Sequence, residues 1–406
     1  MISSAPQPMP PRPSLPAIFL AALRLGCTSF GGPVAHLAYF RREYVERRHW
    51  LDEAHYADLV ALCQFLPGPS SSQVGFGIGL LQRGLAGGIA AWLGFTLPSA
   101  ALMIGFGCGL HALGPLAASG WLQGLKLAAV AVVAQAVLAM WRALCPDAPR
   151  SVLAVAAAAM LLLMPTAWSQ LAVIVVGALL GWRWLPGPSW SAPPVREGQN
   201  HHTPSKLPGA VALGLFFVLL VALPAAARYT GRPALEVAAQ FFRAGALVFG
   251  GGHVVLPLLQ SGIVAPGWVG HDPFLAGYGS AQALPGPLFT FAGFLGTVMS
   301  LGPGGWVGGL WALAWIFMPG LLLVFGVLPW WQGLRARPAM QSALRGTNAA
   351  VVGLLLAALI YPIGTVAWQS AGAAALALAA FAALHVPRVP PWAVVLTAAA
   401  LGGWLF

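Results

Sequence analysis

Two stretches of the chain place one arginine beside a pair of glycines in apolar surroundings. Arg24 stands six residues before Phe30-Gly31-Gly32, and Arg243 stands six residues before Phe249-Gly250-Gly251. Steps of three and four residues return to one side of a helix, so each arginine shares a face with the first glycine beside it. Arginine side chains and freed N–H groups at the start of a half-helix both bind anions. The stretches therefore indicate an anion site, although the alternative for Arg24 is an interfacial topology anchor.

Each stretch is followed by a second break, built from proline and glycine. Gln64 precedes Leu66-Pro67-Gly68-Pro69, Gln282 precedes Leu284-Pro285-Gly286-Pro287, and both copies keep the same spacing from an upstream tryptophan. A glycine weakens a helix interior by roughly 1 kcal/mol and a proline by about 3 kcal/mol. In a membrane such breaks persist where they line a cavity or pack on protein. Glycine and proline also serve as plain kink residues, but two copies at matched spacing favour a functional role.

Hydrogen-bond donors follow the first proline-glycine break but hardly the second. Ser70, Ser71, Ser72 and Gln73 come directly after the first break, whereas the second is followed by two apolar residues and Thr290. Oxyanions accept hydrogen bonds from such hydroxyl and amide groups, so we expect the first copy to be the more specialised for the anion. The predicted substrate-binding residues are Arg24, Phe30, Gly31, Gly32, Gln64, Pro67, Gly68, Pro69, Ser70, Ser71, Arg243, Phe249, Gly250, Gly251, Gln282, Pro285, Gly286 and Pro287.

The composition fixes the class of protein that must hold these residues. Hydrophobic residues make up 59% of the 406 residues and charged residues only 7%, which leaves too little polar surface to cover a soluble fold. The sequence therefore predicts an all-α polytopic membrane protein. The net charge of +11 comes mostly from basic residues in short loops, where they meet lipid headgroups, and no nucleic-acid-reading module accompanies them.

A window of roughly 20 residues finds about thirteen apolar segments. In the first half they lie near 15–40, 55–82, 86–112, 120–142, 150–165 and 168–185. An extra segment lies near 208–227, and those of the second half lie near 234–260, 272–300, 303–331, 341–363, 366–385 and 390–406. The chain thus divides into a disordered tail (1–16), a first repeat (17–185), a polar linker with one extra helix (186–233) and a second repeat (234–406).

Counting these segments predicts how the two repeats are oriented. Seven segments separate the starts of the repeats, so single crossings would make the repeats inverted with respect to each other. About eleven basic residues fall on the N-terminal side and about seven on the other side, which places the N-terminus in the cytoplasm. The loop with Arg41, Arg42, Arg47 and Arg48 opposes this orientation, unless its interleaved acidic residues pair with these arginines in a short interfacial helix.

A second basic pair is also repeated. Lys126 and Arg345 occupy matching positions near the start of a segment in each repeat. Basic charge at a helix start opposes the helix dipole, so helix stabilisation does not explain these two residues. We expect both side chains to anchor their helices at the lipid headgroups.

The remaining ionisable residues show no enzyme signature. The histidines are scattered, the HExxH motif and the P-loop are absent, and acids inside apolar segments are rare. The four cysteines have no metal-ligand spacing, so we expect neither a metal nor another cofactor. Asp58 and His36 lie inside apolar segments of the first repeat and are the candidates for proton coupling.

The duplicated residues resemble the chromate ion transporter family in its long, two-domain bacterial form. The resemblance rests on Phe30-Gly31-Gly32-Pro33, on the run from Trp50 to Pro69, and on the second copy from Phe249 to Pro287. It implies export of chromate from the cytoplasm across the bacterial inner (plasma) membrane, and hence chromate resistance. The second copy has Gly252 at the position of Pro33, so the resemblance does not imply that both copies bind substrate equally.

Electrostatics favours the same direction of transport. Moving one charge across 100 mV is worth about 2.3 kcal/mol, so a dianion that leaves an inside-negative cell gains about 4.6 kcal/mol per 100 mV.

One alternative to a chromate exporter is a carrier of sulfate or another oxyanion, with chromate as a mimic. Another, from a different class, is a membrane-embedded enzyme acting on a phosphate-bearing lipid. The sequence leaves the coupling mode and the formation of a homodimer open.

Overall fold

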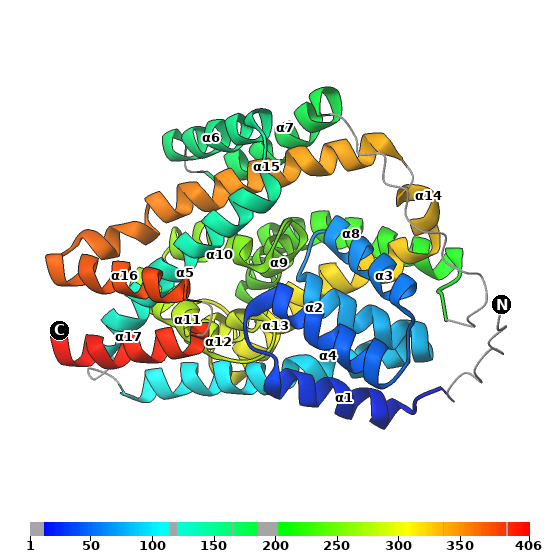
Figure 1. Ribbon diagram of the computed structural model, residues 1–406, viewed down its shortest axis with the longest axis horizontal. Helices are drawn as coiled ribbons and strands as arrows, with labels where there is room; N and C mark the ends of the chain where they lie inside the picture. Colours follow the sequence, from blue (N-terminus) through cyan, green and yellow to red (C-terminus); the bar gives the residue numbers. More distant parts are fainter. Residues whose placement is uncertain (1–11, 114–119, 165, 186–201, 336, 387–388) are drawn as a thin grey trace, which may run out of the picture.

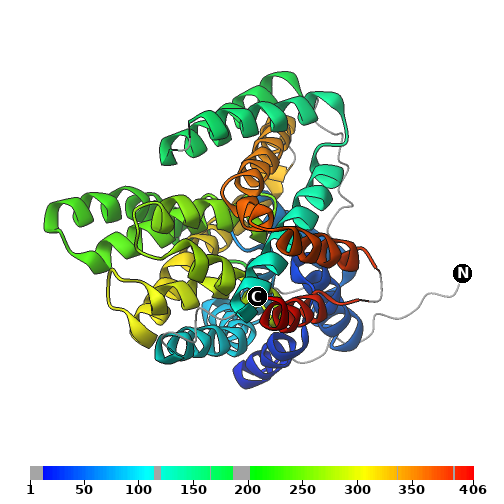
Figure 2. The ribbon, with the colours of Figure 1, turned by 90° about the vertical axis from the view of Figure 1, so that its left-hand side faces the viewer.

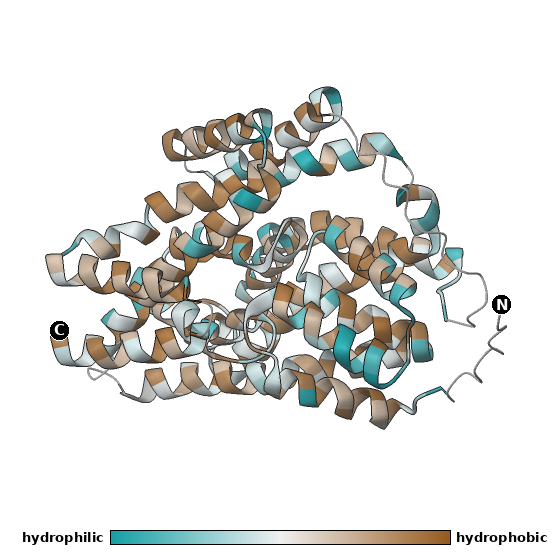
Figure 3. Cartoon of the chain, viewed as in Figure 1, coloured by the Kyte–Doolittle hydropathy of each residue, from teal (hydrophilic) through white to brown (hydrophobic). Residues whose placement is uncertain are grey.

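The computed structural model describes residues 12–113, 120–164, 166–185, 202–335, 337–386 and 389–406, and within these ranges the chain is helical without a strand. The architecture is that of an all-α polytopic membrane protein, as the composition predicts. Most of the ribbon is hydrophobic, and hydrophilic residues gather in short stretches (Figure 3). Residues 1–11 of the predicted tail and 186–201 of the predicted linker lie outside the described residues.

The first half contains seven α-helices and one π-helix within the described residues. They are α1 (Leu15–Thr28), α2 (Gly32–Phe40), the π-helix η1 (Arg41–Arg47), α3 (Glu53–Phe65), α4 (Ser70–Leu113), α5 (Gly120–Leu144), α6 (Ala148–Leu163) and α7 (Ala167–Trp184). Helix α4 leaves helical geometry at Arg83 and Gly84. Its two parts, 70–82 and 85–113, form a hairpin, because a Cβ at Gly79 in the first part would lie 2.2 Å from the Gly87 oxygen in the second. Helix α8 (Lys206–Thr230) then leads to the second half.

The second half repeats this pattern with shorter pieces. Its first elements are α9 (Pro233–Ala246), η3 (Gly252–Val254), α10 (Val255–Leu259), η4 (Gln260–Val264), α11 (His271–Ala283), η5 (Leu288–Thr290), α12 (Phe291–Val298) and α13 (Gly305–Val327). The chain continues through η6 (Leu328–Trp330), α14 (Trp331–Arg335), α15 (Pro338–Ile360), η7 (Ile363–Trp368), α16 (Ala371–Leu384) and α17 (Pro391–Leu405). In Figure 1, α1 begins at the right-hand end of the molecule and α17 ends at the left-hand end.

The predicted segments 15–40 and 55–82 are re-entrant helix pairs. The Nε of Arg83 donates to the Pro13 carbonyl at 2.8 Å, and the side chain of Gln82 donates to the Trp50 carbonyl at 2.6 Å. The chain before α1 and the chain between α2 and α3 therefore lie at the same end of the first half. Because α3 begins at Glu53 and the first part of α4 ends at Gln82, the second pair also starts and ends there.

The second half shows the same arrangement. The Ser300 N–H donates to the Trp268 carbonyl at 3.0 Å, so the end of α12 lies beside the start of α11. The Trp311 indole donates to the Ala234 carbonyl at 2.9 Å, which brings the start of α9 against α13. Helices α1, α3, α9 and α11 have 13 or 14 residues each. At 1.5 Å per residue such helices reach only about 20 Å, less than the roughly 30 Å of a hydrocarbon core.

In each of the four broken segments the chain thus forms two short helices that return to one end, and neither helix alone reaches the roughly 30 Å of a hydrocarbon core. Within the described residues, five helical stretches are long and apolar enough to cross a membrane: Ser70–Leu110, Gly120–Leu144, Lys206–Thr230, Gly305–Arg335 and Pro338–Trp368. The hairpin in α4 reduces the first of these to its second part. Shorter apolar helices, among them α6, α16 and α17, complete the bundle.

The last helices of each half pack on the other half. Helices α6 and α7 lie against α15, while α16 and α17 lie against α5. The contacts are close because glycines face backbone: a Cβ at Gly346 would lie 2.0 Å from the Gly177 oxygen, and one at Gly124 would lie 2.0 Å from the Ala398 oxygen. Figures 1 and 2 both show α6 and α7 standing with α15 at one edge of the molecule. The two halves thus interlock rather than sit side by side.

The basic loop after α2 is internally paired, as its sequence predicts. Arg41 forms ion pairs with Glu46 and Glu53, while Glu43 pairs with Arg47 at 3.1 Å and Arg48 at 2.7 Å. The loop follows the first re-entrant pair, so it lies at the same end as the start of α1. Its arginines therefore no longer oppose the orientation given by the other basic loops.

Candidate functional site

The two kinds of break meet each other across the halves. The Gly68 N–H in the first proline-glycine break donates to the Val248 carbonyl at 2.7 Å, directly before Phe249-Gly250-Gly251. In the matching contact, the Gly286 N–H donates to the Ser29 carbonyl at 2.9 Å, directly before Phe30-Gly31-Gly32. We call these contacts the Gly68 crossing and the Gly286 crossing. Each crossing joins a break of one half to a break of the other.

The geometry of both crossings depends on glycine. Gly68 has φ 130° and Gly286 has φ 99°, a region that residues with a side chain rarely adopt. A Cβ at Gly68 would lie 2.8 Å from the Gln73 side-chain nitrogen, and one at Gly286 would lie 2.7 Å from the Ser99 hydroxyl. The flanking prolines end α3 and α11 and leave backbone groups free to bond across the halves.

Polar side chains surround the Gly286 crossing. The Ser29 carbonyl also lies 3.2 Å from the His36 Nε2, and the Ser99 hydroxyl donates to the Thr96 carbonyl at 3.2 Å. Ser29, His36, Thr96 and Ser99 are all buried. Each comes from the first half, so this crossing has a polar wall in an otherwise apolar core.

The Gly68 crossing is lined differently. The Gln73 amide nitrogen donates to the Pro67 carbonyl at 2.9 Å and to the Gly320 carbonyl at 3.3 Å. Pro319-Gly320 on α13 occupies the place that Pro98-Ser99 on α4 holds at the other crossing. The second half thus supplies backbone where the first half supplies a hydroxyl. That the first copy is the more specialised for the anion stays a prediction.

Several buried polar atoms near the crossings have no hydrogen-bond partner among the described residues. They are the hydroxyl oxygens of Ser29, Ser72 and Thr96, the Nδ1 of His36, the Oε1 of Gln73 and the Nε2 of Gln282. Buried polar groups in proteins are nearly always hydrogen-bonded, and leaving one unpaired costs about 1–3 kcal/mol. The three hydroxyls and the Gln282 amide can donate to an anion.

The two arginines lie in different environments. Arg243 is half-buried and lines a small cavity of about 50 Å³ together with Gln170, Gln240 and Ser261. Arg24 is exposed on α1 and is not among the residues that line this cavity. Arg243 is therefore held inside the protein by α7 and α10, whereas Arg24 faces outward.

The other predicted site residues are spread around the breaks. Gly31 and Gly32 begin α2, Gly250 and Gly251 precede η3, and all four have positive φ. Phe30 and Phe249 are half-buried, Gln64 is exposed near the end of α3, and Ser70 and Ser71 begin α4. Pro67 and Pro285 are half-buried, and Pro69 and Pro287 are buried.

The two candidates for proton coupling are both engaged. His36 lies at the Gly286 crossing as described above. Asp58 accepts a hydrogen bond from the Trp331 indole at 3.1 Å and forms an ion pair with Arg335 of the second half at 2.5 Å. Asp58 therefore ties α3 to α14.

Sequence reasoning missed Ser29, Thr96 and Ser99. Thr96 and Ser99 flank Pro98, and Pro319 holds the matching place in the second half, so comparing prolines between the repeats could have found them.

The prediction that Lys126 anchors its helix at lipid headgroups is wrong, because its side chain is 10% exposed and pairs with Asp272 at 3.1 Å.

Comparison with known proteins identifies the family. The family model described as chromate transporter matches residues 16–182 and 235–404. A chromate transport protein of Pseudomonas aeruginosa is 28% identical over 98% of this chain and 94% of its own length. Similar proteins are the chromate transport protein of Cupriavidus metallidurans, 28% identical over 86% of this chain and 83% of its own length, and a probable chromate transport protein of Synechococcus elongatus, 29% identical over 83% and 82%. No solved structure matches the chain. The chain therefore belongs to the chromate transporter family.

Proposed function

We propose that this protein is a secondary transporter that exports chromate from the cytoplasm across the bacterial inner membrane. The substrate follows from its relatives, which are named chromate transport proteins. The observation that carries the site is the set of buried, unpartnered donors beside the two crossings. A tetrahedral dianion presents several acceptor oxygens, and it would supply the partners that these donors lack.

The proposed site combines three kinds of donor. The broken helices contribute backbone N–H groups, the first half contributes the hydroxyls of Ser29, Ser72 and Thr96, and Arg243 contributes positive charge. The other predicted residues of the two breaks shape the backbone around the anion. Arg24 faces outward and acts, in this proposal, where the anion enters or leaves. The donor asymmetry makes the first half the principal binding surface.

The proposed direction rests on charge. With the N-terminus in the cytoplasm, the loops with the most basic residues lie inside, which agrees with the positive-inside rule. An inside-negative potential of 100 mV favours exit of a dianion by about 4.6 kcal/mol, which is more than a thousandfold in concentration ratio. Export therefore needs no further energy source, and His36 and Asp58 are the residues to examine if protons are exchanged.

Flux from proteoliposomes tests this proposal. Liposomes loaded with chromate should lose it faster when their interior is made negative, and sulfate outside should reveal whether the site also accepts that oxyanion. Arg243→Ala should reduce the rate at least tenfold, because it removes the buried charge. Arg228→Ala, which removes an exposed arginine at the end of α8, is the matched control and should leave the rate unchanged. Wild-type liposomes that retain chromate at every potential would refute the function.

A further inference from the structure

A wide cavity opens at the end of the molecule where α17 ends. It has a volume of about 930 Å³, and its lining includes Lys126, Asp272, Gln123, Ser370 and the C-terminal Phe406. A water molecule takes about 30 Å³ of liquid, so the cavity holds roughly thirty waters and is a vestibule rather than a tight pocket. It lies at the face from which the second half's re-entrant pairs start, since Trp268, Gly270 and Ser300 also line it.

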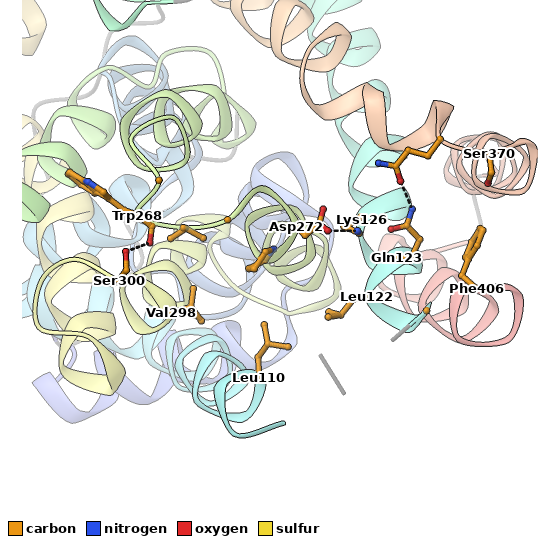
Figure 4. Close-up of a pocket in the computed structure, with 16 residues that line it drawn as sticks. Leu110, Leu122, Gln123, Lys126, Trp268, Asp272, Val298, Ser300, Ser370 and Phe406 are labelled. Atoms are coloured by element: carbon orange, nitrogen blue, oxygen red, sulfur yellow. Dashed lines mark hydrogen bonds and ion pairs between the residues drawn. The ribbon is translucent and has the colours of Figure 1, made fainter. Parts of the chain in front are cut away.

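Lys126 and Asp272 form an ion pair in the vestibule, and the two side chains differ sharply in burial; Asp272 also lies 3.9 Å from the Nδ1 of His271. The Lys126 Nζ lies 3.1 Å from the Asp272 carboxylate, but the lysine side chain is 10% exposed and the aspartate side chain is 66% exposed. Figure 4 shows the pair in the middle of the cavity, between Trp268 and Ser300 on one side and Ser370 and Phe406 on the other. A buried ammonium needs a counter-ion, whereas an exposed carboxylate keeps much of its hydration without one.

The asymmetry makes Asp272 the replaceable member of the pair. If another anion approaches Lys126, the Asp272 side chain can rotate into the solvent at low cost, while the lysine stays paired with the new anion. Further donors line the same cavity: the Gln123 amide makes a long 3.3 Å bond to Gln369, and the Ser370 hydroxyl accepts from the Ala373 N–H while keeping its own hydrogen to donate. These groups match the oxygens of a tetrahedral oxyanion better than those of a single carboxylate.

We propose that this vestibule is a second oxyanion site, in which Lys126 binds the dianion and Asp272 competes with it. The inference rests on the proposed function, because the dianion is the transported substrate on its way between the central site and the aqueous phase. Lys126 draws the anion out of the core, and Asp272 then returns to Lys126 and releases the anion. Asp272 comes from α11 of the second half and Lys126 from α5 of the first half, so the exchange also couples the halves.

Charge-selective labelling of a vestibule cysteine tests the inference without measuring transport. Ser300→Cys, in a background with the four native cysteines replaced, reports on the cavity because Ser300 is exposed and lines it. Protein in nanodiscs is labelled with an anionic sulfonate-bearing thiol reagent and with a cationic trimethylammonium one. We expect the ratio of anionic to cationic rates to fall in Lys126→Gln, because the variant removes a unit positive charge from the cavity that Ser300 also lines.

Three further variants make the result specific. Asp272→Asn should raise the ratio, Lys126→Arg should keep it, and Asp147→Asn, which breaks a partly exposed ion pair with Arg150 elsewhere, should leave it unchanged. Sulfate and chromate should slow the anionic reagent in wild type and not in Lys126→Gln. An equal ratio in wild type, Lys126→Gln and Asp272→Asn would overturn the vestibule site, whatever the flux assay shows. Selective labelling with no chromate flux from wild type would instead overturn the proposed function and leave an oxyanion site here.

Discussion

At the scale of single residues, the two crossings concentrate the constraints of the fold. Gly68 and Gly286 each combine a positive φ, a hydrogen bond to the other half and a neighbour that a Cβ would strike. A substitution at either position changes all three features at once. Two matching positions with the same requirements explain why the proline-glycine motif occurs twice with the same spacing.

Alanine at these glycines should therefore reduce both stability and transport. A side chain at a positive φ costs about 1–2 kcal/mol, and the close contact with Gln73 or Ser99 adds to that cost. We expect Gly68→Ala and Gly286→Ala to unfold at lower temperature in detergent and to export less chromate. Gly105→Ala, on a helix with open space around it, is the control and should behave like wild type. Wild-type stability in both crossing variants would contradict the assigned geometry.

The unpartnered hydroxyls allow stability and function to be separated. Ser72 is buried and its hydroxyl has no partner among the described residues, so Ser72→Ala should be neutral or slightly stabilising. If the hydroxyl donates to chromate, the same variant should raise the KM roughly tenfold, the loss expected for a hydrogen bond to a charged group. Thermal unfolding and initial efflux rates provide the two readouts. An unchanged KM would remove Ser72 from the site.

The sequence predicted motifs better than it predicted partners. The glycines and prolines of both breaks could be found because duplication repeats them at fixed spacing. Their partners could not, since a hydrogen bond from Gly286 to Ser29 joins residues of opposite halves and leaves no local pattern. The burial of Lys126 was missed for the same reason, because Asp272 lies far from it in the chain.

At the scale of elements, the re-entrant pairs show what hydropathy leaves undecided. The segments near 15–40 and 55–82 are apolar along most of their length, and a hydropathy window does not distinguish a helix that crosses from two half-helices that return. The glycine and proline breaks distinguish the two cases, because they divide each segment into half-helices that reach only about 20 Å. The number of apolar segments therefore does not by itself give the number of membrane crossings.

Close packing of α15 on α7 should be sensitive to size. A Cβ at Gly346 would lie 2.0 Å from the Gly177 oxygen, so Gly346→Leu must push the two helices apart. We expect a destabilisation of about 1–3 kcal/mol or more, and a loss of folded protein on size-exclusion chromatography. Gly105→Leu, which has open space around it, should stay folded. Equal behaviour of the two leucine variants would show that this interface is loose.

The loop at η1 should weaken in acid. Burial alone would raise the pKa of Glu43, but hydrogen bonds from Arg48 and Arg47 outweigh it and hold the pKa below its usual value. A carboxylate whose pKa is lowered in the folded state stabilises that state at pH values above the unfolded pKa of about 4.3. This stabilisation is lost as the pH falls through the folded pKa. Hydrogen exchange in a peptide covering the loop should therefore lose protection below about pH 4.

Glu43→Gln is the control for that experiment. The variant removes the titrating group, so protection in the loop should be weaker at neutral pH and should change little on acidification. Full protection of the wild-type loop at every pH would mean that the Glu43 ion pairs do not hold it.

At the scale of the whole molecule, the re-entrant pairs are compatible with the predicted inverted orientation of the two repeats. Seven apolar segments separate the starts of the two repeats, and two of them are the broken segments of the first half, 15–40 and 55–82. If these two do not cross the membrane, five membrane crossings remain. Five is also odd, so the prediction of an inverted pair stands unchanged. The same revision moves four arginines to the N-terminal side, which strengthens the prediction that this side is cytoplasmic.

Cysteine accessibility in intact cells tests this topology. In a cysteine-free background, Glu46→Cys in η1 and Lys206→Cys at the start of α8 should both be shielded from an impermeant reagent outside, while Pro303→Cys should be labelled. All three positions are exposed. Labelling of Glu46→Cys from the outside, with Lys206→Cys protected, would show that the first broken segment crosses the membrane.

The Gly286 crossing has a consequence for how the protein is made. Ser29 leaves the ribosome 257 residues before Gly286, its hydrogen-bond partner. At 5–20 residues per second, the nascent first half waits roughly 13–50 s in the bilayer before that partner is synthesised. Its broken half-helices carry free backbone groups during this interval, and hydrocarbon offers them no partner. Until the second half is made, these groups of the first half therefore depend on hydrogen-bond partners from outside the chain.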